Sequence, residues 1–146
     1  MLNVVIAEDD LMIADMAEEM LVNAGYQVCG IARTVGEAVA LCQLHKPDLI
    51  VIDLRLADAG FGTEIVPQLD DAGRIGILYA TGNAWHPVLT AADGHACLAK
   101  PYRSVDLVRS LEIVAGMVQT GTASPPFPAG FQVLALRTVG PTLEDA

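Results

Sequence analysis

Short apolar runs alternate with amphipathic stretches along the first 118 residues. Five runs have the character of strands; they lie at residues 3–7, 27–32, 48–53, 75–80 and 95–99. The run that ends at Asp53 is apolar and short enough to be buried on both faces of a sheet. Between them, apolar residues recur at helical spacing, most regularly from Ile13 to Ala24. This alternation predicts an α/β fold, with a parallel sheet and helices on both faces.

Local signals place the predicted helices between these strands. Thr34 with Glu37 forms a capping box before the second helix, and Ser104 is the predicted N-cap of the last one. Two shorter helices are predicted near residues 63–69 and 85–92. For five strands joined in this way we expect the flavodoxin-like order 2-1-3-4-5, which brings the first and third strands together at a switch point.

Polar residues with complementary chemistry follow the strands at their carboxyl ends. Glu8 and Asp9 follow the first strand, Asp53 ends the third, Thr81 follows the fourth and Lys100 follows the fifth. Ligands of open parallel sheets bind outside these ends. Neighbouring carboxylates raise one another's pKa values, and Mg²⁺ relieves that repulsion by all-oxygen coordination. The sequence therefore predicts a magnesium site at this edge.

The same residues could carry out phosphoryl transfer. Asp53 is a candidate nucleophile, because aspartate can form an acyl phosphate. Thr81 can donate a hydrogen bond to a phosphoryl oxygen, and Lys100 adds a positive point charge. Phosphoryl transfer depends more on positioning and charge neutralisation than on covalent machinery, so this set is sufficient for it.

Four motifs occur in order at these strand ends. They are VVIAEDD at residues 4–10, DLIVID at 48–53, ATG at 80–82 and KPY at 100–102. Together they resemble the bacterial response-regulator receiver domain over residues 1 to about 118. Each motif alone is weak, whereas four in the expected order form a specific signal.

The resemblance implies a role for each of these acidic residues. It implies that Asp53 accepts a phosphoryl group from a histidine kinase in a Mg²⁺-dependent reaction. It further implies that Asp9 binds the metal directly, that Glu8 acts largely through water, and that Arg55 contributes its backbone carbonyl. Asp10 lies one place beyond the usual acidic pair, so we expect it to flank the site without binding the metal.

One position departs from the family pattern. The family usually carries an aromatic switch residue three positions before the lysine, where this chain has Cys97. The stretch Tyr79-Ala80-Thr81-Gly82 instead resembles a subset of receivers with a Phe-Ala-Thr-Gly motif, many of which stand alone and lack the usual switch. Trp85 is a candidate substitute for the missing reporter.

Residues 119–146 differ in character from the preceding part of the chain. A small polar linker at 119–124 leads to the prolines of 125–128 and an apolar segment at 131–136. Leaving such apolar side chains in water is costly. We therefore predict an apolar arm, with no effector domain, that exchanges with a second copy in a homodimer through residues 125–140. A disordered tail and docking onto the same domain remain open.

The composition of the chain limits which molecules it can bind and where in the cell it is expected. The net charge of −10 argues against nucleic acid and anionic membrane as direct partners. Apolar runs are too short for a membrane span, and the first residues lack a cleavable targeting segment, so a cytoplasmic location is expected. The expected partners are a sensor histidine kinase and a downstream protein target or phosphotransfer protein.

These observations favour a single-domain response regulator that catalyses only its own phosphorylation and dephosphorylation. Two alternatives stay open. A hydrolase that forms an aspartyl phosphate would usually carry a second acid two residues after Asp53, where this chain has Arg55. A flavodoxin-type module that binds FMN would need a Ser/Thr/Gly-rich loop after the first strand, where this chain has acidic residues.

Overall fold

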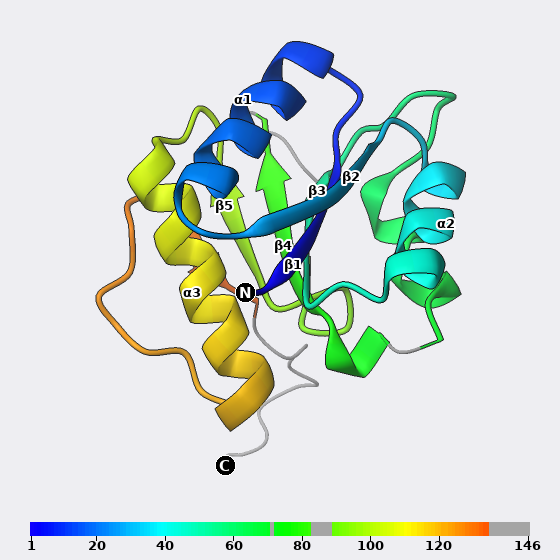
Figure 1. Cartoon of the computed structure of the whole chain (residues 1–146). Coiled ribbons are helices and arrows are strands. Elements are labelled where there is room, and N and C mark those ends of the chain that lie inside the picture. The colour runs from blue at the N-terminus through cyan, green and yellow to red at the C-terminus, as the bar shows by residue number, and fades with distance from the viewer. Residues whose placement is uncertain (71, 83–88, 135–146) are drawn as a thin grey trace.

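A six-stranded sheet forms the centre of the computed structural model, which describes residues 1–70, 72–82 and 89–134 (Figure 1). The spatial order of the strands is β2-β1-β3-β4-β5-β6. Their bounds are Asn3–Ala7 for β1, Gln27–Ala32 for β2, Leu49–Asp53 for β3, Gly76–Thr81 for β4, Ala96–Ala99 for β5 and Phe131–Val133 for β6. The first five strands are parallel in the order 2-1-3-4-5, which confirms the predicted flavodoxin-like fold.

Helices pack against both faces of this sheet (Figure 1). Helices α1 (Leu11–Asn23) and α3 (Ser104–Thr120) cover one face, and α2 (Val35–His45) covers the other. Side chains of a strand alternate in direction, so successive residues of β3 enter opposite cores. Leu49 and Val51 face α1 and α3, whereas Ile50 and Ile52 face α2, and all four are buried.

The short helices differ from the prediction. In place of one helix near residues 63–69 there are two 3₁₀ turns, at Gly62–Glu64 and Val66–Gln68, followed by a third at Ala72–Arg74. Pro67 contributes to this outcome, because it has no N–H group to donate to an α-helical hydrogen bond. Of the helix predicted over 85–92, residues 85–88 lie outside the described part of the chain.

The described remainder of that predicted helix, residues 89–92, is not helical. Residues 89 and 90 are irregular, and residues 91–93 form a turn. The predicted cap of the last helix is also wrong. Arg103 is the N-cap residue, without a side-chain capping hydrogen bond, and Ser104 already belongs to α3. Capping depends on which residue keeps an extended backbone, and Arg103 has that conformation here.

The C-terminal arm adds the sixth strand to its own domain. β6 pairs antiparallel with β5, so that Phe131 lies opposite Leu98 and Val133 lies opposite Ala96. Docking onto the same chain was one of the alternatives open from the sequence. Exchange of the arm with a second copy stays a prediction, and residues 135–140 of the predicted interface lie outside the described residues.

Within the described parts of the chain, no helix has the length and apolar character that a membrane crossing requires.

Two helix starts allow a matched test of capping. The Thr34 hydroxyl accepts a hydrogen bond of 3.1 Å from the backbone N–H of Glu37 at the start of α2. Thr34→Ala should therefore lower the free energy of unfolding by about 1 kcal/mol, measured by urea denaturation. Ser104→Ala should cost much less, because Ser104 does not cap α3. Equal losses in the two variants would contradict these cap assignments.

Candidate functional site

Strand register brings the predicted site residues to one edge of the sheet. β1 and β3 pair so that Ala7 lies opposite Ile52, and β4 and β5 pair so that Thr81 lies opposite Ala99. The residues that directly follow β1 and β5, and the last residue of β3, therefore meet at the carboxyl edge. This is the arrangement that the sequence predicts for the site.

Three carboxylates form the centre of this edge. Glu8, Asp9 and Asp53 each offer a carboxylate oxygen, and these oxygens all lie within 4.8 Å of one another. Glu8 is buried, and the other two are partly exposed. Ionised carboxylates this close repel each other unless a cation lies between them. The oxygen donors and their partial access to water fit Mg²⁺, which needs few protein ligands and keeps several waters.

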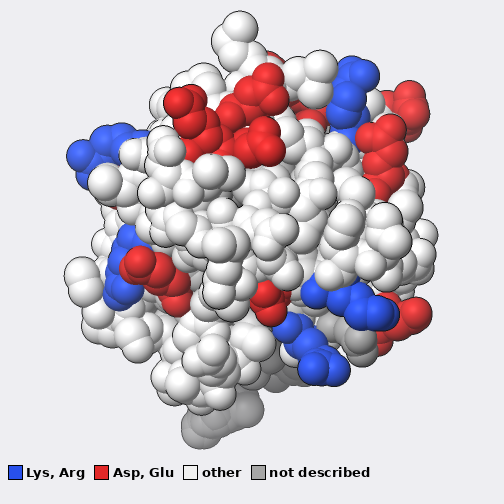
Figure 2. Space-filling model, viewed as in Figure 1, with Lys and Arg blue, Asp and Glu red and all other residues white. Residues whose placement is uncertain are grey.

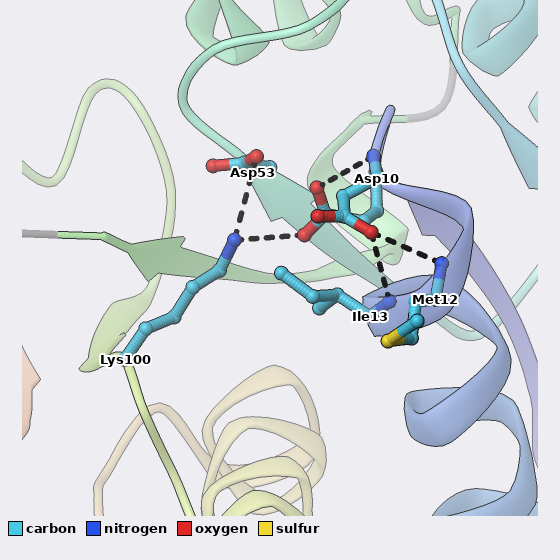
Figure 3. A network of polar contacts seen from close by, with 6 residues as sticks. Asp10, Met12, Ile13, Asp53 and Lys100 are labelled. Atoms are coloured by element: carbon cyan, nitrogen blue, oxygen red, sulfur yellow. Dashed lines mark hydrogen bonds and ion pairs between the residues drawn. The ribbon is translucent and has the colours of Figure 1, made fainter.

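Lys100 provides positive charge to this group. Its Nζ lies 2.8 Å from Oε1 of Glu8 and 3.4 Å from Oδ2 of Asp53. Figure 3 shows the Lys100 side chain reaching towards Asp53. Burial by itself would lower the pKa of Lys100, but the two carboxylates together outweigh it and raise that pKa. Lys100 therefore carries its charge at neutral pH and partly neutralises the acidic cluster.

Glu8 responds in the opposite way to the same surroundings. Burial is the main cause that raises the pKa of its carboxyl group, and the neighbouring Asp53 raises it further. The hydrogen bond from Lys100 acts against both effects. The ionised form of Glu8 thus depends on a nearby cation.

Asp10 anchors helix α1 beside the cluster. One oxygen of its carboxylate accepts hydrogen bonds from the backbone N–H groups of Met12 at 3.0 Å and Ile13 at 3.3 Å (Figure 3). Its own N–H donates to Oε2 of Glu8 at 3.2 Å. Its side chain is thus used as a helix cap, and its place outside the metal ligands stays a prediction.

The remaining predicted residues, Thr81 and Arg55, differ in their exposure. Thr81 is buried at the end of β4, and its carbonyl accepts the backbone N–H of Lys100 at 2.7 Å. Arg55 is exposed and forms an isolated antiparallel bridge with Phe61. The proposed use of its carbonyl as a metal ligand stays a prediction.

Gly62 is a structural part of the site that the sequence analysis missed. A Cβ atom at this position would collide with the carbonyl oxygen of Asp53 and with the Ile52 side chain. Its N–H donates to the carbonyl of Leu54 at 2.8 Å. Only glycine allows the loop to fold back so closely onto the end of β3. A glycine in the loop after Asp53 was the available signal.

Cys97, at the position where the family usually has an aromatic residue, is packed inside the domain. Cys97 is buried in β5, opposite Tyr79 of β4 and Gln132 of β6. Tyr79 is also buried, and its hydroxyl donates to the carbonyl of Asp93 at 2.8 Å. Neither side chain points freely into solvent as a rotating reporter would. Trp85, the candidate substitute, lies outside the described residues.

Fold and site together define a signalling module of the receiver type, with acids, a threonine and a lysine at the carboxyl edge of a flavodoxin-like sheet. The chain belongs to the response regulator receiver domain family, whose model matches residues 4–112. Members of this family generally act as signalling modules rather than enzymes. Neither the hydrolase nor the flavodoxin alternative is favoured by this membership.

Named relatives agree with this assignment. The transcriptional regulatory protein PdtaR of Mycobacterium tuberculosis is 30% identical over 123 residues, which are 82% of this chain and 60% of that protein. A crystal structure of a mutant anti-anti-sigma factor PhyR from Bartonella quintana is 30% identical, with a TM-score of 0.64 over 83% of this chain and 50% of that one. The chain thus spans less than two thirds of the length of each of these relatives.

A structure of matching size shows the same fold. The CheY-like receiver domain protein from Methanospirillum hungatei superposes with a TM-score of 0.73 at 24% identity, over 84% of this chain and 99% of that chain. The flavodoxin-like arrangement is therefore shared by a receiver domain with little sequence similarity.

The stabilisation of the ionised Glu8 carboxylate by Lys100 can be measured through the free energy of unfolding. Lys100→Met should lower the free energy of unfolding by about 1–3 kcal/mol at pH 7 without divalent cations, because a buried carboxylate loses its partner. The loss should shrink towards pH 5. The pKa of Glu8 is raised in the folded protein, so protonation then favours the folded state.

Urea denaturation at both pH values tests this expectation. Lys46→Met is a matched control, because Lys46 is exposed and takes part in none of the ion pairs found among the described residues. A loss for Lys100→Met that is the same at pH 5 and pH 7 would show that the charge of Glu8 does not cause it.

Proposed function

We propose that this chain is a response regulator whose Asp53 accepts a phosphoryl group from a sensor histidine kinase. The observation that carries the proposal is the group of carboxylates within 4.8 Å of one another, with Lys100 bridging Glu8 and Asp53. An oxygen of Asp53 attacks the phosphorus of a phosphohistidine. The P–N bond breaks, the imidazole leaves with the bonding pair and takes up a proton, and an acyl phosphate forms.

The acidic cluster fits the Mg²⁺ that this reaction requires. Glu8, Asp9 and Asp53, together with the carbonyl of Arg55, would hold the ion. When bound, it neutralises negative charge on the carboxylates and on the phosphoryl oxygens. Because the ion would then neutralise the Glu8 carboxylate, the ammonium group of Lys100 can bind a phosphoryl oxygen instead. The hydroxyl of Thr81 donates a hydrogen bond to another.

An apolar surface beside this edge supports a helical protein partner. Leu11, Met12 and Met16 of α1 are more than half exposed, as is Val105 of α3. A groove of about 620 Å³ lies between the two helices, with Met16 and Val105 among its lining residues. Methionine adapts well to the shape of a partner. Because Asp10 caps α1 next to Glu8, a kinase bound here would lie close to Asp53.

The charge distribution fits protein partners as well. In Figure 2 acidic side chains gather over the upper part of the visible face, where α1 lies in Figure 1, and basic side chains are scattered. A net charge of −10 supports a role without nucleic acid or anionic membrane. The Bartonella quintana relative is an anti-anti-sigma factor, which supports output by protein contact.

The proposal has four further parts. Residues 1–118 act as the receiver domain and residues 119–146 as an arm. The protein works in the cytoplasm, and it passes its signal to a downstream protein or to a phosphotransfer protein. Two copies associate through residues 125–140, for which the pairing of β6 with β5 supplies a ready register.

Intact mass measures the phosphoacceptor directly. After incubation with acetyl phosphate and Mg²⁺, the wild-type chain should gain one phosphoryl group, and Asp53→Asn should gain none, because an amide does not attack phosphorus as a carboxylate does. Asp10→Asn is the control: it removes a neighbouring charge, keeps a good N-cap residue and should gain the adduct. An adduct that persists in Asp53→Asn would refute the site assignment.

Thermal unfolding tests the metal ligands separately. Mg²⁺ that binds only the folded protein stabilises it, by about 2.7 kcal/mol at a hundredfold excess over the dissociation constant. Wild-type and Asp10→Asn should therefore show a rise in Tm with Mg²⁺. Asp9→Asn should lose most of that rise. If Asp9→Asn responds to Mg²⁺ like the wild type, the ion is bound elsewhere.

A further inference from the structure

We propose that the edge of β5 is an interaction surface for an uncharged extended strand, occupied at rest by the chain's own arm. When Asp53 is phosphorylated, this arm is released and the arm of a second copy takes its place. The inference rests on the proposed phosphorylation of Asp53, and it names the surface and the trigger of the proposed dimer.

The resting arm shows what this surface binds. At one end of the paired segment the N–H of Ala99 donates to the carbonyl of Gly130 at 3.0 Å, and at the other the N–H of Leu134 donates to the carbonyl of His95 at 3.0 Å. Leu134 is buried in the core on the α2 side, whereas Phe131 packs against the opposite core. The occupant is therefore an extended strand with apolar side chains towards both cores.

The connection to this strand is short for the path it takes. α3 ends at Thr120, and β6 begins at Phe131, so ten residues run back along the helix (orange in Figure 1). A helix of 17 residues is about 25 Å long, and ten extended residues span at most about 36 Å. The connection thus uses roughly 70% of its maximum reach, and short connections favour exchange between copies.

Arg109 holds this connection halfway along α3. Its Nε donates to the carbonyl of Pro126 at 3.1 Å, and its Nη2 donates to the carbonyl of Ser124 at 2.7 Å. Both contacts are to backbone and lie at an exposed position, so they can be broken without disturbing either core. The arm is thereby held at three places: the end of α3, Arg109 and β5.

The strand that pairs with β5 is uncharged. The whole chain has a net charge of −10, but residues 119–134 contain no charged side chain. The exchanged strand, Phe131–Val133, therefore adds no like charge at the new contact. The sequence is identical, so the second arm can form the same β5–β6 pairing and gives up only the two hydrogen bonds to Arg109, as reciprocal exchange around a two-fold axis allows.

Neighbouring peptide groups connect this surface to the phosphorylation site. The N–H of Ala99 binds Gly130 of the arm, and the N–H of the next residue, Lys100, binds the carbonyl of Thr81. Lys100 and Thr81 are the residues that would approach a phosphoryl group on Asp53. Their movement displaces the end of β5, to which the arm is bonded.

The contact at this point tolerates little displacement. Gly130 has a φ of +83°, which favours glycine, and a Cβ atom there would lie 3.3 Å from the Cβ of Ala99. The backbone of the arm is therefore packed closely against β5. A shift of Ala99 alters both the hydrogen bond and this packing, so the arm senses the state of the site without an aromatic residue at Cys97. The chain's own connection is fixed by Arg109 and does not follow this shift, whereas the arm of a second copy enters without that tether and can follow it.

The test follows adduct formation and dimerisation in the same full-length samples. Wild-type chain and Asp53→Asn are incubated with acetyl phosphate and Mg²⁺, intact mass reports the adduct, and sedimentation reports the dimer. Hydrogen exchange at low concentration follows the Leu134 amide. In the wild type we expect about tenfold faster exchange of this amide and a shift to dimer, and in Asp53→Asn neither. Wild type that carries the adduct but shows neither change would overturn the inference.

Arm variants test the surface independently of phosphorylation. Arg109→Ala releases the connection and should tighten dimerisation about tenfold without acetyl phosphate, because two hydrogen bonds of the resting arm are lost. Arg103→Ala is the control at the N-cap of the same helix; among the described residues the Arg103 side chain pairs with Asp106 alone, and this variant should leave dimerisation unchanged. Equal dimerisation in both variants would overturn the inference, even if no adduct ever formed.

A charged substitution identifies the pairing strand itself. Phe131→Asp places a carboxylate in β6, so the phosphorylated variant should stay monomeric while its adduct forms normally. A phosphorylated Phe131→Asp chain that still dimerises would show that another surface is used, which also overturns the inference. Absence of an adduct in the wild type would instead refute the proposed function.

Discussion

Repulsion among the carboxylates at the edge of the sheet is the constraint on which this site depends. Glu8, Asp9 and Asp53 are held within 4.8 Å of one another by the pairing of β1 with β3, so they cannot separate to relieve it. Two kinds of positive charge can answer the repulsion: the ammonium of Lys100, which is present in the chain, and a divalent cation. When a divalent cation binds, less negative charge is left for the Lys100 ammonium to neutralise, and the reverse also holds. The positions of the charged groups at this edge therefore depend on whether the cation is bound.

Hydrogen bonds connect the charged groups at this edge to the backbone of the neighbouring elements. Glu8 is bonded to the N–H of Asp10, which caps α1, and Lys100 continues directly from the strand that carries the arm. A redistribution of charge at the edge therefore reaches a helix on one side and a strand on the other. Both routes consist of one or two hydrogen bonds, so they need no long chain of side chains between the site and the surface.

Features that depend on local sequence were predicted well. The limits of β1 and β2 agree with the structure, because apolar runs between polar residues define them, and Thr34 caps α2 as its position suggested. The acidic cluster also followed from the sequence, since parallel strands necessarily bring their carboxyl ends together. Once the strand order was known, the neighbours of Asp53 were known as well.

Features that depend on distant contacts were not predicted. Ser104 has the chemistry of a cap, but the backbone conformation that decides capping belongs to Arg103. The arm could have been disordered, swapped or docked, because the choice depends on the free edge of β5 and on Arg109, which meets carbonyls 15 and 17 residues away. Gly62 likewise matters because of what lies next to it in space.

The two faces of the sheet are covered by elements of different stability, which determines where local unfolding begins. Among the described residues, one face is covered by the long helices α1 and α3, whereas the other is covered by α2 and by 3₁₀ turns flanked by Ile65 and Leu69. Turns of three residues offer few cooperative hydrogen bonds, so they belong to the least stable segments of a fold. Local unfolding should begin there. The loop after Asp53 can thus open to solvent while the face covered by α1 and α3 stays intact.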